Sequence, residues 1–132
     1  RVGVRWAGII GMSATIIAFM GYAGATSSAM MYVAMIPGAL GALAGPALSS
    51  IASGQVGAAQ QGELQGGLSS MMSLTSIVSP PIMTQTFALF SGTDHILYFP
   101  GAPFFLAAIL TTFSLILFIR VTSNLTIPQS VN

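Results

Sequence analysis

A stripe of hydroxyl side chains is the feature of this chain best suited to contact a ligand. At about 100° per residue, five residues of the segment 63–90 share one side of a helix: Ser69, Ser73, Ser76, Pro80 and Thr84. We call them the hydroxyl stripe. Hydroxyl groups both donate and accept hydrogen bonds, and Met72 and Met83 beside the stripe add adaptable apolar contact. The pattern suits recognition of an amphipathic molecule, although hydroxyl groups also hydrogen-bond neighbouring membrane helices.

Groups for acid–base or metal chemistry are scarce. The 132 residues include two acidic residues, one histidine and no cysteine, which excludes thiolate metal sites and cysteine nucleophiles. Asp94 and His95 are neighbours but have no third ligand nearby, so they are interpreted as a solvated loop. The glycines from Gly38 to Gly45 lie in an apolar segment, which does not fit a nucleotide-binding loop. We therefore expect no enzyme activity, no metal and no cofactor.

The composition is that of a membrane protein. Hydrophobic residues make up 54% of the chain and charged residues 4%, against about 25% charged in soluble domains. A bilayer accommodates such a surface because lipid surrounds it, whereas a net charge of +1 offers no basic field for nucleic acid. The expected fold class is an all-α membrane protein with four transmembrane helices. Their approximate ranges are 3–25, 29–53, 63–90 and 104–120.

Prolines interrupt two of these segments. Pro37 and Pro46 lie within 29–53, and Pro80 lies within 63–90. Each removes a backbone hydrogen bond and bends the helix, so Pro46 and Pro80 are the candidate hinges. Tyr32 and Met35, in the same segment as Pro46, are added to the hydroxyl stripe as candidates for a cavity wall.

The connecting loops define an orientation. The loop 54–62 is polar but uncharged and leads to Glu63, which is either a solvated helix-start charge favoured by the helix dipole or paired with another part of the protein. Four spans place all three arginines on the same side as this loop, and the positive-inside rule makes that side cytoplasmic. The loop 91–103 is then external.

Several motifs resemble the C-terminal half of tetracycline-resistance-type drug:proton antiporters of the major facilitator superfamily. They are PALSS at residues 46–50, QGELQG at 61–66, Ser79-Pro80, and YFPGAPF at 98–104. The resemblance covers nearly the whole chain. It assigns a cytoplasmic loop motif to Gln61, Gly62, Glu63, Gln65 and Gly66.

The resemblance implies the last four of twelve helices, with the tenth and eleventh lining the substrate cavity. It implies efflux of an amphipathic drug or metabolite, exchanged for protons by alternating access, in a bacterial inner membrane with both ends of the chain cytoplasmic. The partners would be the lipid bilayer and the preceding helices of the same transporter. The charged residues of the expected spans, Arg5, Glu63 and Arg120, lie at the ends of those spans, so the proton-coupling residues would lie on those preceding helices.

A second interpretation is a free-standing four-helix membrane protein. It would be either a small multidrug exporter or a structural or assembly subunit. Small exporters need a carboxylate within the membrane, and the position of Glu63 at a helix end argues against that role.

Overall fold

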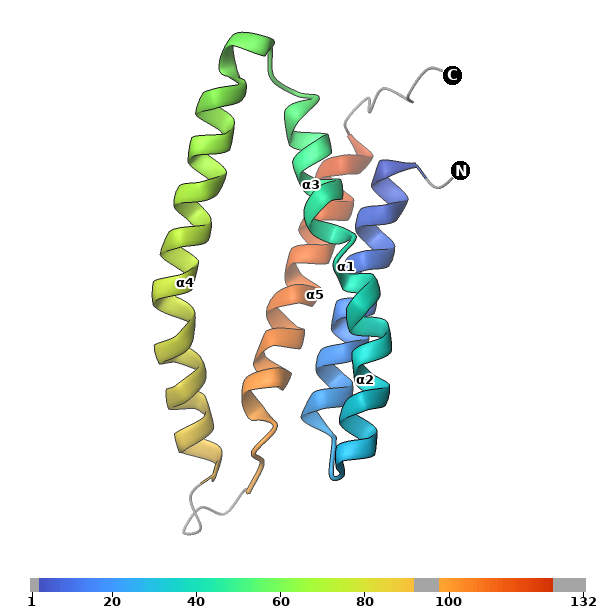
Figure 1. Ribbon diagram of the computed structural model, residues 1–132, viewed down its shortest axis with the longest axis vertical. Coiled ribbons are helices and arrows are strands. Elements are labelled where there is room, and N and C mark those ends of the chain that lie inside the picture. The colour runs from blue at the N-terminus through green and yellow to red at the C-terminus, as the bar shows by residue number, and fades with distance from the viewer. Residues whose placement is uncertain (1–2, 92–97, 125–132) are drawn as a thin grey trace.

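The computed structural model describes residues 3–91 and 98–124. Within them the chain forms five α-helices and one 3-10 turn, and no strand (Figure 1). The bounds are α1 Val4–Ala23, α2 Ser28–Gly41, α3 Ala44–Ser53, η1 Ala58–Gln60, α4 Gln61–Ser91 and α5 Ala102–Ser123. The all-α membrane class is confirmed, because α1, the combined segment Ser28–Ser53 and α5 are each long and apolar enough to cross a bilayer.

Helix α4 differs from the other expected spans in composition. Its 31 residues give a length of about 46 Å, which exceeds the hydrocarbon thickness of a bilayer. Its serine, threonine, glutamine and glycine residues lower its hydropathy, so it is not among the three spans that composition identifies in the described ranges. Figure 1 shows α4 as the longest helix, at the edge of the molecule.

Helix α1 packs closely against α2 and α3 through small side chains. A Cβ atom placed on Gly21 would lie 2.8 Å from Ala34 Cβ, and one on Gly11 would lie 2.7 Å from the backbone nitrogen of Ala44. Gly41 likewise faces Thr15, whereas Gly45 has open space around it. Of these two glycines, therefore, only Gly41 is at the α1 contact. Such residues let two membrane helices approach closely.

The expected bent helix over 29–53 is one candidate span, Ser28–Ser53, in which a turn at residues 42 and 43 separates α2 from α3. Pro46 lacks the N–H that would bond the Ala42 carbonyl, and its ring crowds that oxygen. At the break the backbone N–H groups of Ala42 and Leu43 donate to the carbonyls of Ala39 and Leu40, three residues back, at 3.3 and 3.1 Å. Pro37 lies inside α2 without interrupting it.

Other boundaries also differ from the expected ones. The loop 54–62 contains η1, and α4 begins at Gln61 rather than Glu63. Helix α5 extends beyond 104–120 at both ends. At its start Pro103 is accommodated in the first turn, where the missing N–H costs nothing. Asp94 and His95 lie outside the described residues. The start of α1 and the end of α5 lie at the same end of the molecule as η1 (Figure 1).

Helix α4 makes little contact with the rest of the chain. None of its residues is buried, and in its middle Met71, Met72 and Ile77 are 70–73% exposed. Its contacts lie near its ends, with α3 and η1 at one end and with α5 toward the other. There the Phe99 backbone N–H donates to the Phe90 carbonyl at 2.9 Å. Helix α5 lies between α4 and α2 in Figure 1.

Candidate functional site

The hydroxyl stripe lies on an open side of α4. All five of its residues are exposed. Apart from Ser91 at the end of the helix, the half-buried residues occupy another side, roughly 100° around the axis at the ordinary helical rotation: Gln61, Leu64, Leu68, Ser79, Met83, Thr86 and Phe90 lie there. The stripe is therefore directed away from the described helices, where a further part of the protein or a ligand has access to it.

Hydrogen bonding within α4 determines what the stripe offers. Ser73 donates its hydroxyl proton to the Ser69 carbonyl at 3.0 Å, and Ser76 donates to the Met72 carbonyl at 2.9 Å. With these protons engaged, the two hydroxyl oxygens remain as acceptors. The Ser76 carbonyl is another acceptor, because Pro80 lacks the N–H that would bond it. This part of the stripe is suited to contact a partner that carries hydrogen-bond donors.

The prolines of α4 do not break the helix. Residues 61–91 are helical throughout, Pro80 and Pro81 included. Two consecutive prolines free the carbonyls of Ser76 and Ile77 from the helical ladder. The hinge function of Pro80 stays a prediction, as does that of Pro46, although Pro46 lies just after an observed break.

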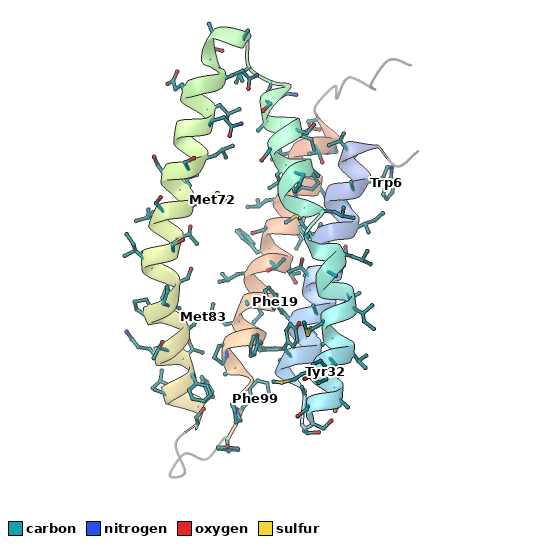
Figure 2. All side chains as sticks on the ribbon, in the orientation of Figure 1. Trp6, Phe19, Tyr32, Met72, Met83 and Phe99 are labelled. Carbon is teal, nitrogen blue, oxygen red and sulfur yellow. The ribbon has the colours of Figure 1, made fainter. Side chains whose placement is uncertain are left out.

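Tyr32 and Met35 belong to a different surface from the stripe. They line a groove of about 430 Å³ between the end of α1 and the starts of α2 and α5, together with Tyr22, Ser28, Met31 and Phe104. The rings of Tyr22 and Phe104 are tilted, with centroids 5.4 Å apart, which is a favourable aromatic geometry. Figure 2 labels Tyr32 on α2 and Met72 and Met83 on α4, across α5 from each other. The structure does not bring the two sets of predicted cavity residues together.

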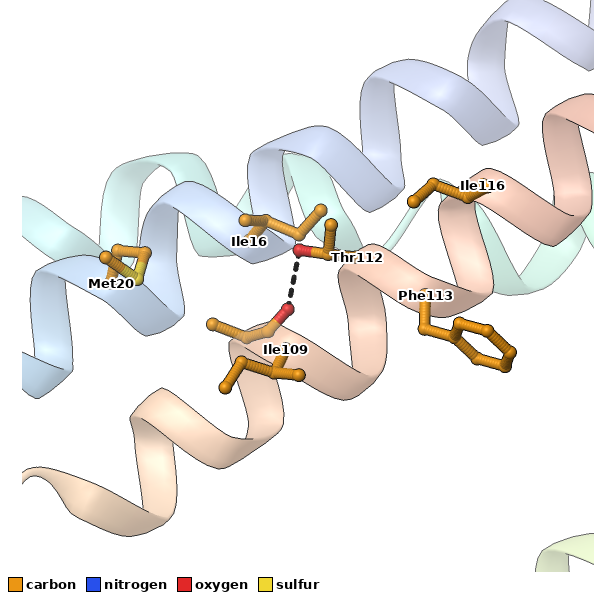
Figure 3. A pocket seen from close by; sticks show the side chains of 7 residues that line it. Ile16, Met20, Ile109, Thr112, Phe113 and Ile116 are labelled. Carbon is orange, nitrogen blue, oxygen red and sulfur yellow. Dashed lines mark hydrogen bonds between the residues drawn. The ribbon is translucent and has the colours of Figure 1, made fainter.

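Sequence reasoning missed a second groove, between α1 and α5. It measures about 330 Å³ and is lined mainly by apolar residues, with Thr112 as its hydroxyl (Figure 3): Ile16, Met20, Ala108, Ile109, Thr112, Phe113 and Ile116. Thr112 donates to the Ala108 carbonyl at 2.7 Å, so its proton is also engaged within its helix. No sequence signal distinguishes these residues, because both segments are apolar throughout. The groove is suited to hold a hydrocarbon chain.

The loop motif separates into one bonded residue and four exposed ones. Gln61 donates its side-chain N–H groups to the carbonyls of Ser53 and Val56, at 2.8 and 3.3 Å. Gly62, Glu63, Gln65 and Gly66 are exposed. Glu63 lies in the first turn of α4, where the helix dipole favours a carboxylate, and it forms no ion pair with the residues that the structure describes.

The described residues contain no group of side chains that would bind a metal ion. Within the same ranges the arrangement is one of hydrogen-bonding and apolar surfaces without a nucleophile–base pair.

Comparison with known proteins gives a match in sequence. The chain is similar to the class C tetracycline resistance protein of Escherichia coli. The two are 36% identical over 110 residues, which is 83% of this chain. The chain spans 28% of the length of that relative. No protein-family model matches the chain. No solved structure matches it either.

Proposed function

We propose that this chain is the C-terminal part of a proton-coupled secondary transporter of the major facilitator superfamily, which exports a tetracycline-like or other amphipathic compound. The similarity to a tetracycline resistance protein supports the class of function. The site is supported by one observation: the hydroxyl stripe is exposed, on a helix that has no buried residue. A membrane helix with polar groups on one side needs protein or a water-filled cavity on that side.

In this proposal α4 is the third of the four spans in chain order, and its hydroxyl stripe forms part of the cavity wall. Helices that precede this chain in the transporter would cover the remaining exposed sides of α4, including Met71 and Met72. Tyr32 and Met35 would contact the substrate from the separate groove near the start of α2. Secondary transporters generally alternate between two states, which open a site near the bilayer midplane first to one side of the membrane and then to the other.

The end of the molecule that carries η1 would be cytoplasmic, in a bacterial inner membrane. Arg5 lies in the first turn of α1 and Arg120 in the last turn of α5, and both helix ends lie at the η1 end (Figure 1). Positive residues favour the cytoplasmic side of a membrane. Glu63, in the first turn of α4, would face the same compartment.

Transport by the full-length protein tests this proposal. Everted bacterial membrane vesicles that contain it should accumulate labelled tetracycline when a pH gradient is imposed. An uncoupler should abolish the accumulation, and vesicles without the protein should show none. Equal accumulation with and without the protein, across a panel of amphipathic drugs, would contradict the proposal.

A further inference from the structure

We propose that Gln61 is a positioning residue, whose side-chain amide fastens the first turn of α4 to the end of α3. The attachment sets the angle at which α4 leaves the turn and, with it, the presentation of the hydroxyl stripe. The attachment itself is independent of the proposed transport function, and only its effect on substrate rests on that function.

The geometry calls for hydrogen-bond donors at the end of the side chain. The Gln61 Nε2 atom lies 2.8 Å from the Ser53 carbonyl oxygen and 3.3 Å from that of Val56. Ser53 is the last residue of α3, and the final carbonyls of a helix have no partner within it. The terminal NH₂ of glutamine has two donor hydrogens, which match these two acceptors. A glutamate side chain of the same shape would place oxygen against oxygen.

Packing at this end of α4 is limited to the half-buried Leu64 and Leu68 and to contacts with η1 and α3. Cβ atoms placed on Gly57, Gly62 and Gly66 would meet nothing within 4 Å, and Glu63 is exposed.

Helix α3, in contrast, is well anchored. Ala47 and Ile51 are buried, and Ala44 lies against Gly11 of α1. The Gln61 amide therefore joins a fixed helix to one that has few other contacts. Because α4 is about 46 Å long, a small change in its angle at Gln61 displaces the middle of the stripe much farther than it displaces the first turn of the helix.

The test measures the position of α4 in the full-length protein. Spin labels on exposed residues of α3 and α4, at Ser49 and Ser70, report the distance between the two helices. We expect Gln61→Glu and Gln61→Leu to raise the population of displaced distances roughly five- to ten-fold, as expected for the loss of one or two modest hydrogen bonds. Gln61→Lys should retain the original distance, because an ammonium group supplies donors and reaches both carbonyls.

Gln60 provides the matched control. It is the adjacent glutamine, its side chain is exposed, and its backbone N–H donates to the Gly57 carbonyl at 2.9 Å. Gln60→Glu makes the same change of charge and should leave the distance unchanged. An unchanged distance in Gln61→Glu and Gln61→Leu would overturn the proposal, and so would equal displacement in Gln60→Glu.

Transport kinetics supply a separate measurement. The substrate KM should rise in Gln61→Glu and return toward the original value in Gln61→Lys, at matched protein amounts. If the unmodified protein transports nothing, the proposed function fails, whereas the distance measurement still decides the role of Gln61.

Discussion

Gly11 marks a point where the backbones of two helices nearly touch. A methyl group there would lie 2.7 Å from the Ala44 nitrogen, and this atom belongs to the backbone and cannot rotate away. Gly41 and Gly45 are four residues apart and would share one face of a continuous helix, so the sequence does not show which of them contacts α1. In the structure only Gly41 of the two faces α1.

Substitutions at two glycines test this contact. Gly11→Ala should destabilise the protein by about 1–3 kcal/mol, the usual cost of overpacking. Gly45→Ala should be neutral or stabilise by up to about 1 kcal/mol, because Gly45 is helical with open space around it and alanine favours a helix. Thermal unfolding of the full-length protein in detergent compares the two. Equal stability of the two variants would argue against the close contact.

At the scale of helices, proline chemistry explains the break between α2 and α3. The sequence placed bends at Pro37 and Pro46 alike, yet only the second lies next to a break. Pro46 falls in the first turn of α3, four residues after Ala42, so the two effects of the ring act on the junction itself. Pro37 is enclosed by a continuous helix. Both prolines remove the same kind of backbone hydrogen bond, so the sequence alone does not distinguish the two sites.

Pro46→Ala should strengthen the junction. It restores an N–H that can bond the Ala42 carbonyl, so amide exchange at residues 42–45 should slow by about ten-fold, equivalent to about 1.4 kcal/mol from one hydrogen bond. If the break also acts as a hinge, the transport rate should fall. Pro37→Ala is the control and should leave exchange at 42–45 unchanged. Equal protection of 42–45 in both variants, measured by hydrogen–deuterium exchange, would show that Pro46 does not cause the break.

At the scale of the whole molecule, the membrane class and helix order follow from composition and hydrophobic length. Apolar segments need lipid around them, and the short links between helices leave few arrangements. The exposure of α4 did not follow from the sequence, because periodicity shows which residues share a side and not what covers that side. The same limit applies to Tyr32 and Met35, which were grouped with the stripe by residue type but lie across α5 from it.

Thiol accessibility along α4 of the full-length transporter tests most directly whether the hydroxyl stripe faces the substrate cavity. Single cysteines at Ser69, Ser73 and Ser76 should react with a membrane-impermeant maleimide, and bound substrate should slow that reaction. Cysteines at Thr75 and Thr86, on the other side of the helix, should react slowly and show no protection. Fast, substrate-protected labelling at Thr75 and Thr86 with unreactive stripe positions would contradict the assignment.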